Sequence, residues 1–252
     1  MEKYLTQMDS ILAKLFAKYS QTLHSPGMLL SGGIDSSTVS YLVSQYFQNY
    51  SIFSMGTGKT KDREYIDIIC NKLNHSYDWV EISEDKIENN MKTIDSLLKQ
   101  AGIEISMMQR SLAMGYFLLF EEVKKAGVTH IFTGQGPDIL LAGYHKYESV
   151  KNINREIEKD LPFLEIDKKR DSAMARYFGV TLINPYLSEE FIEFSLSIPQ
   201  EYKMKEGVEK YILREYARTK GIPDQIVRRP KKAFQYSTGI QSLINNMYYH
   251  VK

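Results

Sequence analysis

Only one cysteine, Cys70, is present among the 252 residues of the chain. A single thiol cannot form a disulfide within the chain, and it cannot supply a CxxC metal site or redox pair. Apolar runs long enough to cross a membrane are also missing, and residues 1–23 lack the apolar core of a signal peptide. We therefore expect a cytoplasmic protein without a membrane partner.

The chain also lacks an excess of charge of one sign. Lysine and arginine total 32, and aspartate and glutamate total 31, which gives a net charge of +1 at pH 7. This balance does not provide the broad basic surface that nucleic-acid binding requires, so no nucleic-acid partner is expected. A hydrophobic content of 43% and a charged content of 25% are typical of a globular protein.

Short apolar runs alternate with segments of helical periodicity through the first half of the chain. Strands are predicted over residues 28–30, 51–56, 77–82 and 128–133. Helices are predicted over residues 2–23, from about 35 to 43, and over 62–73, 84–101 and 106–126. Strands that alternate with helices indicate an α/β fold with a doubly wound, mostly parallel sheet.

Strand signals become scarce after about residue 139. Helices are predicted over residues 148–160, 167–178, 188–197 and 208–219, with prolines between them. The closing stretch, 240–252, is either a docking helix or a frayed end. Because no low-complexity linker interrupts the chain, we expect one domain over residues 1–252, with an α/β core at about 24–145 and a helical layer at about 146–252.

The most informative segment runs from Met28 to Thr38 and reads Met-Leu-Leu-Ser-Gly-Gly-Ile-Asp-Ser-Ser-Thr. An apolar run, a glycine turn and helix-start residues follow one another, so backbone N–H groups and the helix dipole would form an anion site. The serine hydroxyls can donate to phosphate oxygens, and Asp35 can hold a Mg²⁺ ion that binds them. An ordinary turn between a strand and a helix is the simpler alternative. The segment is not a Walker A loop, because no Gly-Lys-Ser/Thr ends it.

A second glycine-rich segment, Thr133 to Asp138, follows the last of these strands. Glycine lets the backbone approach a ligand closely. Ligands of doubly wound sheets bind beyond the carboxyl ends of the strands, where Asp35 and Asp138 could meet and share Mg²⁺ ions. The alternative is that Asp138 caps the helix that follows it.

A basic segment, Arg228 to Phe234, lies late in the chain. A charge run is usually a solvated face. The functional alternative is that one of its lysines reaches a polyphosphate or the charge that develops in a transition state.

Together these segments resemble the synthetase domain of the asparagine synthetases and the β-lactam synthetases, which are PP-loop ATP pyrophosphatases. The resemblance extends from about Met28 to Gly239. Its matching motifs, in chain order, are Leu30–Ser37, Met55 before Gly56, Thr133–Asp138 with Gly143-Tyr144, Arg170-Asp171, Pro185-Tyr186-Leu187, Glu209-Lys210 with Leu213-Arg214, and Arg229, Lys231 and Phe234. Seven matches in one order imply a stand-alone synthetase domain with an adenine nucleotide α-hydrolase-like fold.

The resemblance also implies a reaction in two steps. A small-molecule carboxylate attacks the α-phosphate of ATP to give an acyl-adenylate and pyrophosphate, and ammonia or an amine then displaces AMP to form an amide. ATP and Mg²⁺ are the implied cofactors, with Asp35 and Asp138 as the Mg²⁺ ligands. Lys231 would stabilise the transition state, and Gln135 occupies a catalytic position. The implied contacts to ATP and pyrophosphate are Leu30, Ser31, Gly32, Gly33, Asp35, Ser36, Ser37, Met55, Thr133 and Gly134.

Three departures from the family pattern concern the nitrogen donor and the acceptor. Glu2 stands where glutamine-hydrolysing members carry a cysteine nucleophile, so we expect ammonia, an amine or a separate ammonia-supplying subunit to provide the nitrogen. Gln135 replaces a usual glutamate and cannot act as a general base at neutral pH, and Ile139 replaces an acid. Residues 183–188 differ from the family's Arg-Val-Pro-Phe-Leu-Asp.

Two other functions remain open, and a homo-oligomer is possible. A tRNA-modifying PP-loop enzyme would share the ATP chemistry, although the missing CxxC argues against the thiolating type. An ATP-binding subunit without turnover is favoured by Gln135 and Ile139.

Overall fold

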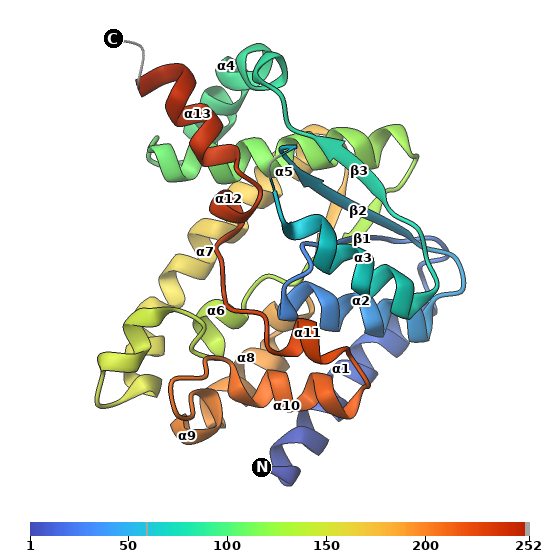
Figure 1. The fold of residues 1–252 in the computed structure, drawn as a ribbon, viewed down its shortest axis with the longest axis vertical. Helices are drawn as coiled ribbons and strands as arrows, with labels where there is room; N and C mark the ends of the chain where they lie inside the picture. Colours follow the sequence, from blue (N-terminus) through green and yellow to red (C-terminus); the bar gives the residue numbers. More distant parts are fainter. Residues whose placement is uncertain (59, 250–252) are drawn as a thin grey trace.

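A five-stranded parallel sheet lies in the upper right of the molecule in the view of Figure 1. The computed structural model describes residues 1–58 and 60–249. Its strands are β1 (Gly27–Leu29), β2 (Ser51–Gly56), β3 (Asp78–Glu81), β4 (His130–Phe132) and β5 (Thr181–Ile183). They lie in the order β3-β2-β1-β4-β5, and every neighbouring pair is parallel. The predicted α/β class with a parallel sheet is confirmed.

Helices cover both faces of this sheet because its strands are apolar on both sides. Along β1 and the residue after it, Met28 and Leu30 enter one hydrophobic core, whereas Leu29 enters the other. The first core is built with α1 (Glu2–Ser20), α2 (Ile34–Tyr46) and α3 (Asp62–Leu73). The second is built with α4 (Glu84–Gln100) and α5 (Met107–Lys125). This two-sided burial is the doubly wound arrangement that the alternation of elements predicts.

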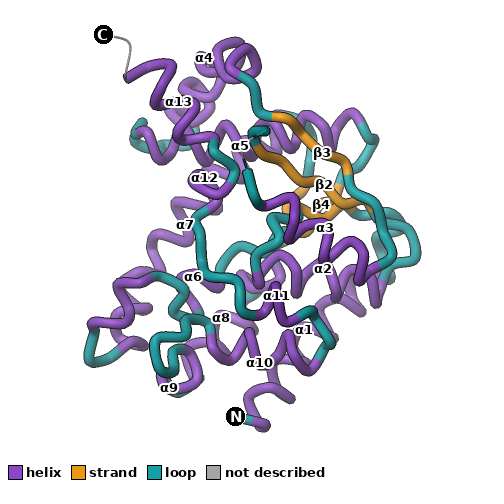
Figure 2. Tube along the Cα trace, viewed as in Figure 1, coloured by secondary structure: helices purple, strands orange, loops and turns teal. Residues whose placement is uncertain are grey.

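The second half of the chain is mostly helical. Its elements are α6 (Pro137–Leu140), η1 (His145–Ser149), α7 (Ile153–Tyr177), η2 (Pro185–Leu187), α8 (Glu189–Ser197), α9 (Gln200–Lys203), α10 (Tyr211–Thr219), α11 (Asp224–Val227), α12 (Phe234–Ser237) and α13 (Ile240–Tyr249). In the view of Figure 2, α6 and α8 to α11 lie below the sheet, whereas α12 and α13 lie near α4 and α5. The last helix packs against α4 and α5, so residues 240–249 form a docking helix. Residues 250–252 of the predicted closing stretch lie outside the described residues.

Strand β5 is absent from the sequence-based expectations. It pairs with β4 through Thr181, Leu182 and Ile183, so a segment expected to be part of a helical layer completes the sheet. A segment of three residues carries no periodicity that separates a strand from the end of a helix. Only its pairing partner makes it a strand.

The prediction of two separate helices over residues 148–160 and 167–178 is also wrong. The structure has η1 followed by one continuous helix of 25 residues, α7, with Pro162 inside it. Proline removes one main-chain hydrogen bond from a helix. The helix continues because Ile157 and Leu164 are buried on either side of the proline, and because Asn152 caps its start by accepting from the Arg155 N–H.

The order of the strands places a topological switch between β1 and β4. Connections leave β1 toward β2 on one side and leave β4 toward β5 on the other, so the turns after β1 and β4 face a common crevice at the carboxyl edge. No helix among the described residues is both long and apolar enough to span a membrane.

Candidate active site

The turn after β1 is held open by glycine and by serine hydroxyls. Gly32 has φ +70°, a left-handed conformation that glycine adopts without strain. The Ser31 N–H donates to Ser36 Oγ at 3.1 Å, and the two hydroxyl oxygens lie 3.0 Å apart. Gly33 caps α2 with its backbone and no side-chain acceptor covers the helix end, so the first N–H groups of α2 are available to an anion.

The turn after β4 lies directly against this helix end. A Cβ at Gly134 would stand 2.6 Å from the Ser36 backbone nitrogen, so only glycine permits the contact. The close approach brings the following residues, including Asp138, to the same place as Asp35. Asp138 is not a helix cap, because Gly136 occupies the cap position of α6.

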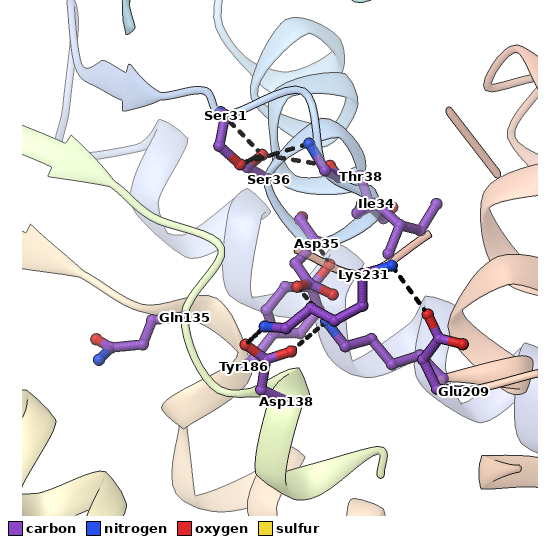
Figure 3. Close-up of polar contacts among 12 residues, drawn as sticks. Ser31, Ile34, Asp35, Ser36, Thr38, Gln135, Asp138, Tyr186, Glu209 and Lys231 are labelled. Atoms are coloured by element: carbon purple, nitrogen blue, oxygen red, sulfur yellow. Dashed lines mark hydrogen bonds and ion pairs between the residues drawn. The ribbon is translucent and has the colours of Figure 1, made fainter. Parts of the chain in front are cut away.

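Two lysines bind the two carboxylates. Lys210 Nζ lies 2.5 Å from Asp35 Oδ2 and 2.6 Å from Asp138 Oδ1, and its side chain is 2% exposed. Lys231 forms an ion pair with the other oxygen of Asp138. Figure 3 shows the side chains of Asp35, Asp138 and Lys231 converging from three separate parts of the chain. Sequence reasoning quoted Lys210 only as part of a motif and did not place it in the site.

The lysines set the charge state of this cluster. Burial raises the pKa of Asp138, but Lys210 and Lys231 outweigh burial and hold it at about 2. Burial raises the pKa of Asp35 above its ordinary value, and only part of this effect is offset by Lys210. Burial lowers the pKa of Lys210, but the two carboxylates outweigh it and the net shift is upward. Asp138 and Lys210 are therefore both charged at neutral pH.

The donor set suits a magnesium ion. Asp35 Oδ1 is buried and has no hydrogen-bond partner, so one carboxylate oxygen is left to accept a cation. The described residues contain no cluster of three or more His, Cys, Asp or Glu side chains at metal-binding distance. Two carboxylates alone match the way Mg²⁺ is usually held, with phosphate and water oxygens as the remaining ligands.

The basic segment after α11 closes over the turn that follows β1. Arg229 Nη1 donates to the Ser31 carbonyl at 3.0 Å, and the guanidinium forms an ion pair with Asp62 on α3. The same guanidinium lies 4.1 Å from the ring centre of Tyr65. The Arg229 side chain is thus only 10% exposed and specifically bound, in contrast to the solvated charge run that composition alone favours.

Arg214 on α10 fixes the rest of this segment. It donates to the Glu209 carboxylate at 2.6 Å and to the carbonyls of Val227 and Arg229. The Lys231 N–H in turn donates to the Glu209 carboxylate at 3.2 Å. A single arginine and a single glutamate therefore hold the backbone on which Lys231 stands.

These groups line a cavity of about 550 Å³, a size suited to a small-molecule ligand. One wall of the cavity is formed by residues at the carboxyl ends of β1, β2 and β4, and we call this wall the sheet side. The predicted residues that line the cavity are Leu30, Ser31, Gly33, Asp35, Ser36, Met55, Thr133, Gly134, Gln135, Asp138 and Lys231. Gly32 and Ser37 are not among the lining residues. Ser37 is fully buried and its N–H donates to the Gly33 carbonyl, so its phosphate contact stays a prediction.

The opposite wall of the cavity, which we call the helix side, is built by α5 and α7 together with residues of η1 and its surroundings. Its side chains are Met108, Gln109, Leu112, Lys146, Asp160, Phe163, Ile166, Asp167 and Arg170. Sequence reasoning assigned no site residue to this wall. Its only signal in the sequence was the Arg170-Asp171 pair.

Gln135 turns toward the helix side. In Figure 3 its side chain points away from Asp35, Asp138 and Lys231. It lies instead beside the carboxyl of Asp171, whose pKa is raised to about 6 by burial despite the adjacent Arg170. The catalytic position that the sequence suggested for Gln135 stays a prediction.

The comparison with known families agrees with this geometry. A sequence model of the asparagine synthase family matches residues 9–174 and 159–252. The chain belongs to the asparagine synthase family. The matched region includes both glycine-rich turns and the segment that carries Lys210 and Lys231.

Curated members of the family cover most of the chain. A putative glutamine-hydrolysing asparagine synthetase of Methanocaldococcus jannaschii is 28% identical over 276 residues, which represent 94% of this chain and 50% of that protein. The glutamine-hydrolysing asparagine synthetase of Gallus gallus is 31% identical over 231 residues, which represent 86% of this chain and 40% of that protein. The chain thus spans half or less of the length of these relatives.

Among solved structures, an NH3-dependent NAD synthetase from Campylobacter jejuni is similar, with a TM-score of 0.47 and 14% sequence identity. The match covers 98% of this chain and 86% of that chain. Membership of the asparagine synthase family rests on the sequence matches.

Proposed function

We propose that this protein is an ATP-dependent ligase that adenylates a carboxylate, releases pyrophosphate and transfers the acyl group to ammonia or an amine. The observation that carries the proposal is the meeting of Asp35, Asp138 and Lys231 beside the open helix end of α2. Family membership supports the same chemistry.

In the first step a carboxylate oxygen of the substrate forms a bond to the α-phosphorus of ATP, and the bond from that phosphorus to the bridging oxygen breaks. The turn from Ser31 to Ser36 and the N–H groups of α2 would bind the departing pyrophosphate. Lys231 would stabilise the charge that builds up on the α-phosphate, because its Nζ lies at the edge of the cavity beside Asp138.

Asp35 and Asp138 would hold Mg²⁺, which when bound neutralises phosphate charge and makes pyrophosphate a better leaving group. Binding of the ion requires Lys210 Nζ to move away from the two carboxylates that it now contacts. The displaced ammonium would remain within reach of phosphate oxygens, since its carbon chain is anchored at the start of α10.

In the second step a nitrogen lone pair forms a bond to the carbonyl carbon of the acyl-adenylate, and the bond from that carbon to the phosphate oxygen breaks. AMP leaves, and the nitrogen gives up one proton to solvent. The cavity continues from the two carboxylates to the helix side, so both substrates can lie in one space. A separate subunit that supplies ammonia, and assembly into a homo-oligomer, are compatible with the proposal.

The test is pyrophosphate release from Mg-ATP across a panel of carboxylates, with and without ammonium. Release that depends on one carboxylate is expected. Asp35→Asn should reduce this release at least a hundredfold, on the scale of removing one electrostatic stabiliser from an active site. Asp78→Asn, on the exposed face of β3, is the matched control and should leave release unchanged.

Other outcomes would favour the alternatives. Tight ATP binding without pyrophosphate release for any carboxylate would favour an ATP-binding subunit without turnover. Release that requires tRNA would favour a tRNA-modifying enzyme.

A further inference from the structure

Among the residues that the structure describes, both cations on the helix side of the cavity, Lys146 and Arg170, are bound to acids. Arg170 is buried, and its guanidinium contacts the carboxylates of both Asp167 and Asp171, at 2.6 and 2.7 Å. Lys146 Nζ lies 2.6 Å from the buried carboxylate of Asp160. Each cation that lines this wall is therefore neutralised by at least one acid. A second carboxylate against this wall would find only cations that already bind an acid, and an anion without a counter-charge is unfavourable away from water. Lys232 also lines the cavity, but it belongs to the basic segment next to Lys231 and not to this wall.

The same wall presents apolar side chains that the protein itself leaves uncovered. Met108 on α5 is 49% exposed, and Phe163 and Ile166 on α7 are 55% and 38% exposed. All three line the cavity. Apolar side chains on a helix face that turns inward are usually buried by the protein itself. Three exposed apolar side chains around one cavity therefore indicate an apolar surface that a bound ligand would cover.

The two sides of the cavity are connected where the reacting group would lie. Lys231 Nζ lies 5.2 Å from the ring centre of Tyr144, and Tyr144 also lines the cavity. A carboxylate positioned at Lys231 would therefore extend its body past Tyr144 toward α5 and α7.

We propose that the carboxylate substrate has an apolar body without a second anionic group, and that Met108, Phe163 and Ile166 select it. This inference rests on the proposed adenylation, because that reaction places the substrate carboxylate at Lys231. It excludes aspartate as the preferred substrate, since aspartate has two carboxylates and no apolar body.

Calorimetry with Mg²⁺ and α,β-methylene-ATP, which cannot release pyrophosphate, tests binding separately from chemistry. The probes are hexanoate and adipate, which share a six-carbon chain and differ in the second carboxylate, together with aspartate. Hexanoate should bind at least about tenfold more tightly than adipate or aspartate. Phe163→Ser and Ile166→Ser should each weaken hexanoate about fivefold or more without changing the affinity for the nucleotide.

Tyr177→Ser is the matched control, because Tyr177 lies on the same helix, is also 55% exposed, and does not line the cavity. It should bind hexanoate as the wild type does. Equal or tighter binding of adipate or aspartate, undetectable hexanoate binding, or cavity variants that bind hexanoate normally would each overturn the inference.

Pyrophosphate release with ATP then separates the two proposals. Selective hexanoate binding without release from any carboxylate would contradict adenylation and leave the apolar pocket standing. Release that is fastest with aspartate would support adenylation and overturn the apolar substrate.

Discussion

At the scale of single residues, Lys210 has the most consequential position. Its ammonium lies between two carboxylates that would otherwise face each other across the site, and it binds both. It can do so because Gly143 has no side chain, since a Cβ there would stand 2.1 Å from Lys210 Cε. The lysine thus acts as an internal counter-ion in the place where a metal ion would bind.

Lys210→Met should destabilise the protein and make its stability depend on Mg²⁺. We expect a loss of about 1–3 kcal/mol, below the ~3–5 kcal/mol of a fully buried pair because the two carboxylates are partly exposed. Thermal unfolding with and without excess MgCl2 measures the effect, and Mg²⁺ should restore part of the lost stability in the variant.

Lys168→Met is the control, since Lys168 makes only an exposed ion pair at 4.0 Å with Glu165. An unchanged unfolding temperature in Lys210→Met, or an equal response of both variants to Mg²⁺, would contradict the counter-ion role.

At the scale of elements, α7 links the two halves of the molecule. Its first half contributes Ile157 and Leu164 to one hydrophobic core, and its second half contributes Met174 to the other. Its middle carries Phe163 and Ile166 on the cavity wall. A helix that spans both cores therefore also forms the wall that contacts the proposed substrate.

Pro162→Ala should stabilise α7. Alanine restores the main-chain hydrogen bond that proline cannot donate, and it has the higher helix propensity. A gain of about 1–3 kcal/mol is expected, and urea denaturation measures it. Glu165→Ala, an exposed change on the same helix, should alter stability by less than about 0.5 kcal/mol. No gain in Pro162→Ala would mean that the proline relieves strain elsewhere in the helix.

Much of this architecture follows from local sequence, and the misses have physical causes. The strands β1 to β4 and the helices between them follow from periodicity and turn residues, and the turns after β1 and β4 follow from their glycines. Strand β5 and the continuity of α7 depend on tertiary partners. The three residues of β5 are too few to show a strand pattern, and Pro162 inside α7 wrongly suggests that the helix ends there. Lys210 was missed for the same reason, because it lies 175 positions from Asp35.

At the scale of the whole molecule, one buried lysine links stability to pH. Lys203 on α9 is 0% exposed and its Nζ has no hydrogen-bond partner in the described structure. Burial lowers its pKa from 10.5 to about 7, with only partial compensation from Glu158. Between pH 7 and 10.5 the unfolded chain binds more protons at this position than the folded chain, so this lysine makes stability rise with pH in that window.

Lys203→Met should remove this pH dependence and stabilise the protein at neutral pH. Replacing an unpartnered buried ammonium by an apolar side chain of similar length should add about 1–3 kcal/mol near pH 7. Urea denaturation of both proteins from pH 7 to pH 10 measures the difference, which should shrink as the pH rises. A difference that stays constant or grows with pH would show that the lysine is charged and paired in the folded state.

The long separations within the site have a consequence for protein synthesis. Ser31 and Arg229, which touch in the folded protein, lie 198 positions apart. A nascent chain on the ribosome exposes the turn after β1 long before the ribosome has translated Lys210, Arg229 and Lys231. Until those codons are read, the two carboxylates lack their counter-ions and the turn lacks its arginine. The complete set of contacts around the two carboxylates can therefore form only after translation has passed residue 231, so an incomplete chain lacks the assembled site.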